Sequence, residues 1–321
     1  MRRATCAVLA AAALLLLPAA TASASPAVVG IGEQSPAIFS DPAWLRLNTP
    51  DVRYIVAWDA LRVPWEKAEV DDYLAAARDA GARVLLGFSR SRSPSLARRK
   101  FLPSPTRLRR EFLAFRSHYP WVKTYLTWNE ANLRGQPTWN RPRMVARYYD
   151  MLRRNCHTCT IVGPAVLDSL AMPSWVKQVE HYTRYPVTIW ALHNYIDANR
   201  FRTRGTRSLL AATRATHSKI WFTETGGLVR RDNGSRIEFA DSKRHAVEAT
   251  RQVELLARLS PRIRRVYFYH WVAPPPDSTW DSALMDRRGR PRPAYQLVRT
   301  YIRRSRAANR LLASRRANSS K

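Results

Sequence analysis

The sequence predicts one α/β domain built as a closed barrel of eight parallel strands that alternate with helices, the (β/α)8 or TIM-barrel architecture. Three observations support this prediction. Short strand-like segments alternate with helical patterns along the chain after its first 24 residues. Several of these segments are apolar at consecutive positions, as parallel strands buried on both faces usually are. Eight such repeats fit the usual size of a closed barrel, and no change in composition marks a second domain.

The expected strands are short and rich in β-branched and aromatic residues. They lie at residues 27–32, 52–58, 82–88, 122–128, 159–163, 187–193, 219–224 and 265–271. An open doubly wound sheet is the competing architecture. It would need a glycine-rich first turn that opens directly into a helix, and "GIGEQS" lacks both the third glycine and the helix.

The expected helices are marked by capping residues followed by proline or by an apolar stripe. Asp41-Pro42 and Ser104-Pro105 each place a capping residue before a first-turn proline. The segment "VDDYLAAARDAG" carries an apolar face and stops at Gly81. Further helices are expected after Asn140-Arg141-Pro142, from Asp241 through "DSKRHAVEATRQVELLARL", which is expected to be the longest, and over "RPAYQLVRTYIRR".

The N-terminus has the form of a secretory signal peptide. Met1-Arg2-Arg3 is positive, "AVLAAAALLLLPAA" is apolar, and small residues end at Ala24, which predicts cleavage after that residue. A membrane anchor is the alternative, but the apolar run is short for a span. We therefore expect a secreted, extracellular protein without a membrane span after signal removal, with the barrel at residues 25–305 and a basic C-terminal tail at 306–321.

The mature chain keeps two cysteines, Cys156 and Cys159, in "RNCHTCT". In an exported protein a local disulfide is expected, joining the end of a helix to the start of a strand. A redox-active pair is the alternative. A zinc ribbon would need a second pair of cysteines, which the sequence does not contain.

The net charge of +30 comes mainly from arginine, since only seven of the 54 basic residues are lysine. One interpretation is a polyanionic partner, such as nucleic acid or an acidic polymer of the cell envelope. The other is an arginine bias spread over solvated helix faces, because arginines recur on every expected helix. We expect at most a weak electrostatic association with anionic envelope polymers, no specific nucleic acid, and a monomer.

Two glutamates stand at strand ends where a barrel would bring them together. Active sites of such barrels form at the carboxyl ends of the strands. Glu130 follows the fourth expected strand in "TYLTWNEAN", and Glu224 follows the seventh in "KIWFTETGG". Two carboxyl groups that face each other across a cleft are what glycoside hydrolysis needs, one as an acid and the other as a nucleophile or base. Unequal burial and mutual repulsion would separate their pKa values.

These motifs resemble clan A of the glycoside hydrolases, which are retaining (β/α)8 enzymes. The resemblance implies that Asn129 contacts a sugar 2-hydroxyl, Glu130 is the acid/base and Glu224 is the nucleophile. His193 and Tyr195 after the sixth strand and Trp271 after the eighth match in kind. The clan's arginine beside the nucleophile has no clear counterpart, and Arg90 is the candidate. No single family signature is complete, so the resemblance gives no substrate.

Further candidate residues have two interpretations each. Glu33 is either a substrate contact or a brace at the barrel mouth. Tyr195 either ends its strand or donates a hydrogen bond to Glu224. Trp58 and Trp271 are either core residues or platforms for a sugar face. His193 is either packed in the core or a substrate ligand, and we expect neither a metal nor a cofactor.

The sequence therefore predicts an exported, retaining glycoside hydrolase that acts on a β-linked glycoside or polysaccharide. The alternative is a catalytically silent barrel that binds carbohydrate or an envelope polymer. A polyanion-binding protein that uses the barrel only as a scaffold is a third possibility. The presence of both carboxylates favours the enzyme, because a silent binder does not need them.

Overall fold

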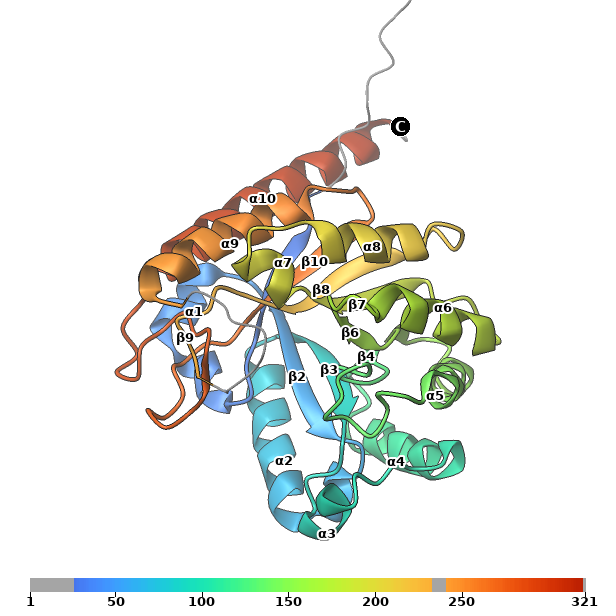
Figure 1. Cartoon of the computed structure of the whole chain (residues 1–321). Helices are drawn as coiled ribbons and strands as arrows, with labels where there is room; N and C mark the ends of the chain where they lie inside the picture. Colours follow the sequence, from blue (N-terminus) through green and yellow to red (C-terminus); the bar gives the residue numbers. More distant parts are fainter. Residues whose placement is uncertain (1–25, 233–240, 320–321) are drawn as a thin grey trace, which may run out of the picture.

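A computed structural model of the chain describes residues 26–232 and 241–319 (Figure 1). The predicted signal peptide, residues 1–24, and its cleavage point lie outside the described residues. Strands run through the middle of the molecule, and helices lie around them. No helix of the described part is both long enough and apolar enough to cross a membrane.

The described residues form one main parallel sheet of nine strands in the order β5-β4-β3-β2-β1-β10-β8-β7-β6. Its strands are β1 (Val28–Gly32), β2 (Asp51–Ala57), β3 (Arg83–Ser89), β4 (Thr124–Leu126), β5 (Thr160–Val162), β6 (Ala165–Leu167), β7 (Ile189–His193), β8 (Lys219–Thr225) and β10 (Ile263–Tyr269). Each of the eight predicted strands overlaps one of these. β6 is the only one of the nine without a predicted segment of its own.

The barrel closes at a stave made of two pieces: β5 overlaps the fifth predicted strand, and β6 lies beyond it. β5 pairs with β4, whereas β6 pairs with β7. Between the pieces, the Gly163 N–H donates to the Ile189 carbonyl, and the Ala165 N–H donates to the Trp128 carbonyl. Pro164 lies at the break, where a residue without an N–H cannot continue a ladder. The nine strands are therefore eight barrel staves, and the predicted (β/α)8 fold class is confirmed.

Helices follow the strands and cover the outside of the barrel. They are α1 (Pro42–Leu47), α2 (Pro64–Asp79), α3 (Pro94–Arg98), α4 (Pro105–His118), α5 (Pro142–Asn155), α6 (Met172–Tyr182), α7 (Tyr195–Asn199), α8 (Arg204–Ala212), α9 (Lys243–Ala257) and α10 (Pro293–Ser319), with short 3-10 turns η1 (Pro36–Ser40) and η2 (Ala60–Arg62). Asp41 and Ser104 cap α1 and α4 through their side chains, as predicted.

The longest helix is α10 with 27 residues, not the predicted one beginning near Asp241, since α9 has 15. α10 also runs through the predicted boundary between residues 305 and 306. Ser305 donates to the Ala27 carbonyl at 2.6 Å, and Asn309 donates to the Pro26 carbonyl at 3.1 Å. These bonds tie the basic C-terminal segment to the start of the barrel, so α10 continues where a separate tail was expected.

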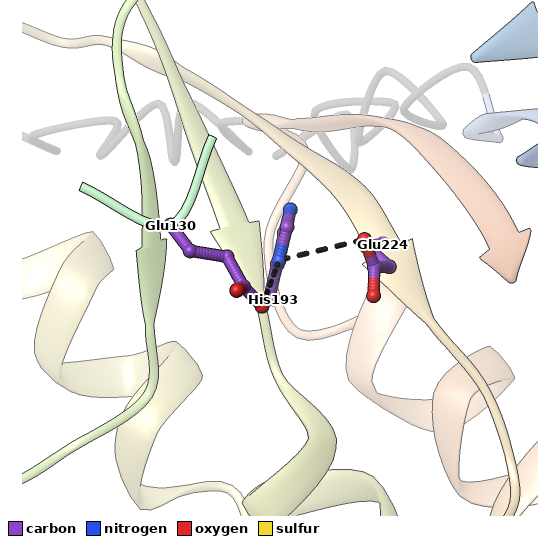
Figure 2. A group of neighbouring side chains, drawn as sticks. All are labelled: Glu130, His193 and Glu224. Atoms are coloured by element: carbon purple, nitrogen blue, oxygen red, sulfur yellow. Dashed lines mark hydrogen bonds and ion pairs between the residues drawn. The ribbon is translucent and has the colours of Figure 1, made fainter. Parts of the chain in front are cut away.

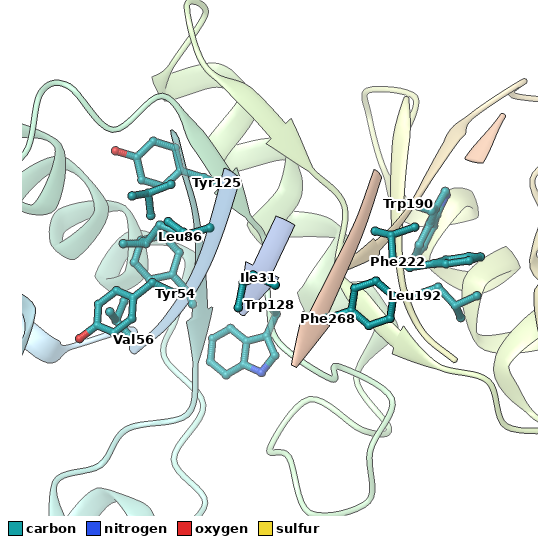
Figure 3. Packing of buried hydrophobic residues seen from close by; sticks show 14 of the residues in the cluster. Ile31, Tyr54, Val56, Leu86, Tyr125, Trp128, Trp190, Leu192, Phe222 and Phe268 are labelled. Carbon is teal, nitrogen blue, oxygen red and sulfur yellow. The ribbon is translucent and has the colours of Figure 1, made fainter. Parts of the chain in front are cut away.

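Alternate residues of each strand point to two different layers of core. One layer lies between the sheet and the helices and includes Tyr54, Leu86, Tyr125 and Phe222 (Figure 3). The second layer fills the inside of the barrel with Leu85, Leu126, Val162, Ala165, Ala191, Trp221 and Tyr267. This division explains the consecutive apolar residues in the strands, because both faces of each strand are buried.

The inside of the barrel is narrow enough to require glycine at particular positions. A Cβ atom on Gly30 would lie 2.4 Å from the Asp51 carbonyl oxygen, and one on Gly87 would lie 2.4 Å from Cδ1 of Ile55. Neither distance is compatible with ordinary packing. The interior is therefore closely packed below the mouth, and the polar side chains at the strand ends form the site.

The predicted disulfide between Cys156 and Cys159 is present, with a Cα–Cα distance of 5.3 Å. It joins the residue after α5 to the residue before β5, as the sequence predicted. A second, two-stranded antiparallel sheet pairs β9 (Arg230–Arg231) with β11 (Trp280–Asp281). This small sheet brings Trp280 to the barrel mouth beside β8.

Candidate active site

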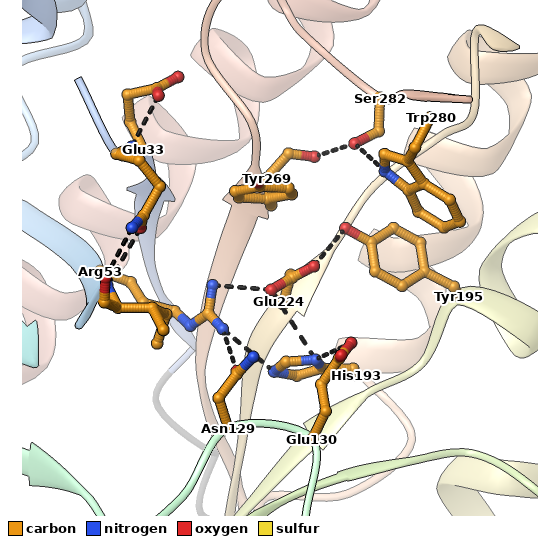
Figure 4. A network of polar contacts seen from close by, with 12 residues as sticks. Glu33, Arg53, Asn129, Glu130, His193, Tyr195, Glu224, Tyr269, Trp280 and Ser282 are labelled. Atoms are coloured by element: carbon orange, nitrogen blue, oxygen red, sulfur yellow. Dashed lines mark hydrogen bonds and ion pairs between the residues drawn. The ribbon is translucent and has the colours of Figure 1, made fainter. Parts of the chain in front are cut away.

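Glu224 lies at the carboxyl end of β8, where two side chains donate to its carboxylate (Figure 4). One Arg53 nitrogen, Nη1, is 2.8 Å from its Oε2 atom, and the Tyr195 hydroxyl donates to Oε1 at 3.2 Å. The side chain is 12% exposed, so one part of it faces the mouth. An ion pair and a hydrogen bond stabilise negative charge on this group and fix its orientation.

Glu130 follows β4 with its side chain directed toward the same centre. Its backbone φ is +49°, in the left-handed region that few residues other than glycine adopt. The Ala131 N–H donates to the Ala165 carbonyl, and the Asn129 N–H donates to the Phe88 carbonyl, so neighbouring strands hold this turn. Backbone strain that surrounding contacts maintain is common at functional sites.

Burial raises the pKa of the Glu130 carboxyl, and the positive charges of Arg53 and Arg90 partly oppose the effect. No ion pair comparable to that of Arg53 with Glu224 is present for Glu130 among the described residues. The two carboxyl groups therefore have different environments. Glu130 is the one better suited to carry a proton, and Glu224 the one better suited to carry charge.

His193 lies between the two glutamates at the end of β7 (Figure 2). Its Nδ1 atom is 3.3 Å from Oε1 of Glu130 and 3.8 Å from Oε2 of Glu224. The ring is fully buried, which lowers its pKa to about 3; Glu224 opposes this shift and Arg53 adds to it. The imidazole is therefore neutral near neutral pH, and one of its two nitrogens can donate a hydrogen bond.

The two carboxyl groups are close enough to act on one bond. One oxygen of Glu130, one oxygen of Glu224 and one ring nitrogen of His193 all lie within 4.8 Å of one another. Retaining glycosidases hold their two carboxyl groups about 5–5.5 Å apart, whereas inverting ones need about 6.5–9.5 Å to admit a water molecule. The separation here fits the retaining geometry.

The same three side chains could in principle hold a metal ion, since carboxylate oxygens and imidazole nitrogen are metal ligands. Arg53 argues against this, because its guanidinium contacts Glu224 at 2.8 Å and lies 3.5 Å from the other ring nitrogen of His193. A cation at this position would meet a fixed positive charge. The prediction that the site uses no metal stays a prediction.

Arg53 is the site residue that the sequence analysis missed. It lies on β2, is 1% exposed, and contacts Glu224, Asn129 and His193; its Nη2 donates to Oδ1 of Asn129 at 2.6 Å. A charged residue inside the apolar run "VRYIVAW" was the signal that could have found it, because a buried arginine needs an acidic partner.

Arg90 does not take the position proposed for it beside Glu224, which Arg53 occupies. It is exposed at the end of β3, and the described residues include no ion-pair partner for it. It lines a cavity of about 570 Å³ together with Glu33, Tyr54 and Ser89. Its charge acts on Glu130 instead, by opposing the rise in the pKa of that carboxyl.

Glu33 braces the barrel mouth, the second of its two predicted roles. Its Oε1 accepts the N–H groups of Gln34 and Ser35, and its Oε2 accepts those of Trp271 and Val272. The carboxylate thus joins the end of β1 to the chain after β10. With four donors and 8% exposure, it has little capacity left for a substrate.

Trp58 and Trp271, each interpreted as either a core residue or a sugar platform, are both in the core. Trp58 is 2% exposed and Trp271 is 1% exposed, so neither presents an indole face to the mouth. Trp271 instead donates from Nε1 to Asp41 at 2.7 Å. A partly exposed aromatic residue near the two glutamates is Trp280, whose ring packs edge-to-face on Tyr195 with centroids 4.8 Å apart. The sequence predicts Trp280, in the loop "APPPDSTWDSALMD", to be either a subsite wall or a loop anchor, but it does not predict the contact with Tyr195.

Comparisons with known proteins identify a family and similar folds. A model of the glycosyl hydrolase catalytic core matches residues 106–297. A search of curated proteins finds no match. The fold is similar to GH5_18 from Streptomyces cattleya in complex with GlcNAc, with a TM-score of 0.59 and 16% identity over 88% of this chain and 81% of that one.

Two xylanases have similar folds. Xylanase 10B from Thermotoga maritima has a TM-score of 0.61 at 11% identity, covering 87% of this chain and 95% of its own. Xylanase XynB from Paenibacillus barcinonensis has a TM-score of 0.62 at 11% identity, covering 84% of this chain and 95% of its own. At these identities the likeness concerns the fold.

Proposed function

The chain belongs to the glycosyl hydrolase catalytic core family, whose model matches residues 106–297, and from this premise we propose that it is a retaining hydrolase of β-linked glycans. The observation that carries the proposal is the pair Glu130 and Glu224, held within 4.8 Å in unlike environments. Glu130 is the proposed acid/base and Glu224 the proposed nucleophile.

In the first step, the Glu224 carboxylate attacks the anomeric carbon while the bond to the leaving oxygen breaks. That oxygen takes the proton of Glu130, whose raised pKa favours the protonated form. In the second step, a water molecule attacks the anomeric carbon and gives its proton to Glu130. The bond between the anomeric carbon and Glu224 breaks as the bond to water forms, and both side chains return to their first state.

The surrounding residues have positioning roles in this proposal. Arg53 fixes Glu224 and Asn129 together, so that the nucleophile and the proposed ligand of the sugar 2-hydroxyl keep a constant separation. Tyr195 orients the second oxygen of Glu224. Neutral His193 adds a polar contact between the carboxyl groups without bringing a charge into the centre.

A covalent-labelling experiment tests the assignment of the nucleophile. A slow fluorinated β-glycoside should label Glu224 in a peptide digest, and Glu224→Ala should abolish turnover. Added azide should restore part of the activity in this variant and give a product of inverted anomeric configuration. Labelling of Glu33 instead would refute the assignment of the pair. No turnover and no labelling on a broad β-glycoside panel would favour the silent carbohydrate-binding barrel.

Glu130→Gln tests the acid/base. It should slow glycosides with poor leaving groups at least about 10²-fold, because only these need a proton on the departing oxygen. For aryl glycosides with activated leaving groups, the rate of the glycosylation step should fall much less. Equal losses on both substrate types would contradict the role of Glu130.

Export is part of the proposal, and it rests on the N-terminal sequence alone. Expression of the full chain in a secreting host should yield a medium fraction whose N-terminus is Ser25. A product that stays with the membrane and begins at residue 1 or 2 would support the anchor interpretation instead.

A further inference from the structure

A groove between α1 and α10 is lined by five arginines. It has a volume of about 310 Å³ and is called the arginine groove below; its arginines are Arg46, Arg299, Arg303, Arg306 and Arg310. The lining residues include no carboxylate. Four of the arginines are exposed and Arg306 is partly so. From this arrangement we propose that the groove binds a linear anionic polysaccharide.

None of these five arginines has an ion pair with a described residue. The contrast within one helix is informative, because Arg304 of α10 lies outside the groove and pairs with Glu254 at 2.8 Å. Most other ion pairs of the described residues also join an arginine to an acidic side chain. Arg292 and Asp281, 2.7 Å apart, are an example. The groove therefore concentrates guanidinium groups that the protein itself does not neutralise, and like charges held together favour an anionic ligand.

The spacing along α10 fits an extended chain of anions. Positions 299, 303, 306 and 310 recur at intervals of four, three and four residues, which places them on one face of the helix. With a rise of about 1.5 Å per residue, successive arginines are displaced by about 4.5–6 Å along the axis, and the four span about 16 Å. A polymer with one acidic group on each sugar unit presents charges at a similar interval.

The other lining side chains favour a glycan over nucleic acid. Asn48, Gln296 and Thr300 offer amide and hydroxyl groups that suit sugar hydroxyls. The lining residues include no aromatic ring, whereas single-stranded nucleic acid is usually held by stacking of its bases on aromatic side chains. Arginine binds carboxylate or sulfate groups through two parallel hydrogen bonds.

The groove is separate from the catalytic pair. α10 packs against α9 and the outer side of β1, and it lies along one flank of the barrel (Figure 1). The lining of the groove shares no residue with the contacts of Glu130 or Glu224. The polymer would hold the enzyme on an acidic glycan network while another segment of glycan enters the mouth. This inference uses the family only to choose the polymer, and it does not depend on the catalytic assignments.

The test is a binding experiment on the full chain with fluorescent oligogalacturonate, which carries one carboxylate per unit. A fully methyl-esterified oligomer of the same length is the neutral control, and dextran sulfate separates carboxylate from sulfate recognition. The variant Arg299→Gln/Arg303→Gln/Arg310→Gln removes three charges and keeps helix-forming side chains. The matched control is Arg78→Gln/Arg98→Gln/Arg244→Gln, which removes three exposed arginines from α2, α3 and α9.

We expect the groove variant to bind oligogalacturonate at least tenfold more weakly and the control less than threefold more weakly. Log affinity falls as log salt rises, and this negative slope should be smaller in magnitude by about 2 in the groove variant, because three charge contacts are lost. Glu224→Ala should bind like the wild type, so a failure of the catalytic proposal would not affect this result. Melting temperatures of all variants exclude loss of folding as the cause.

Several outcomes would overturn the inference. Equal losses in both triple variants would show that only the net charge matters. Equal binding of the esterified oligomer would exclude recognition of carboxylates. A larger groove-dependent loss for single-stranded or duplex DNA, or for vesicles with anionic phospholipids, would assign the groove to that other partner.

Discussion

At the scale of single residues, the site is organised around one buried arginine, Arg53, which contacts several of its side chains. Arg53 contacts Glu224, Asn129 and, at longer distance, His193. It therefore stabilises charge on one glutamate while the other, Glu130, stays in a poorly solvated position that raises its pKa. The two chemically identical side chains therefore have different electrostatic environments, although Arg53 also partly opposes the raised pKa of Glu130.

Replacing Arg53 by Lys should lower kcat/KM about 10²-fold or more. An ammonium group cannot hold the nucleophile and Asn129 with the fixed planar geometry of a guanidinium. Steady-state kinetics on an aryl β-glycoside would measure the effect, with the melting temperature as a check on folding. Arg90→Lys is the comparison. If Arg90→Lys lowered kcat/KM about 10²-fold and Arg53→Lys lowered it only slightly, the arginine beside the nucleophile would be misassigned.

The pH dependence should follow from Glu130. Burial raises its pKa, and catalysis needs its protonated form, so kcat/KM should fall as the pH rises through that raised pKa. The alkaline limb should disappear in Glu130→Gln when the substrate has an activated leaving group. An unchanged limb in that variant would mean that another group, such as Tyr195, sets it. His193 is excluded from this limb, because its pKa is lowered to about 3.

At the scale of elements, the barrel is held together at its least regular stave. The segment from α5 to β6 carries the disulfide, the break at Gly163-Pro164 and the strand that joins β4 to β7. A Cβ on Gly163 would approach Cγ1 of Val187 to 2.6 Å, which explains a glycine at the break. Glu130 leaves β4 immediately beside this stave, so its placement depends on the closure.

Removing the disulfide with Cys156→Ser/Cys159→Ser should reduce the free energy of unfolding by about 2 kcal/mol, the chain-entropy value for so short a loop. For a domain of this size, the melting temperature should fall by about 3 °C. Activity at moderate temperature should be unchanged, because neither cysteine takes part in the proposed reaction at the carboxyl pair. Loss of turnover on mild reduction, without unfolding, would instead indicate a redox-active pair.

At the scale of the whole molecule, the net charge of +30 and the catalytic centre should be separable. The charged side chains of the candidate site are enclosed, with Arg53 1% exposed and Glu224 12% exposed, whereas most arginines face solvent. Salt screens exposed charges more than buried ones. The same barrel can therefore carry a salt-sensitive surface and a salt-insensitive reaction.

Turnover of a neutral aryl glycoside should change less than about twofold between 50 and 500 mM salt, because screening mainly affects exposed charges. Binding of an anionic glycan should weaken steeply over the same range. Parallel kinetics and binding titrations in one buffer series would measure both. A turnover that falls as steeply as the binding would place the surface charge in the reaction itself.

The repeat of strands and helices, and with it the fold and the position of the two glutamates, could be predicted from the order of residues. Strand periodicity and helix caps are local signals, so eight staves and the positions of Glu130 and Glu224 at their ends could be read from the order of residues. The cysteine pair was equally local, since three positions separate its members. The boundaries were less predictable, as α10 shows by continuing to Ser319.

Tertiary structure alone decided which side chains meet. Arg53 and Glu224 are far apart in the chain, and their strands β2 and β8 come near each other because the first and last strands, β1 and β10, pair between them. The same closure buried Trp58 and Trp271 and brought Trp280 to the mouth in their place. The arginine groove also joins α1 to α10 across nearly the whole chain. Burial and contact are properties of the packed molecule, whereas a sequence pattern reports the preference of each segment alone.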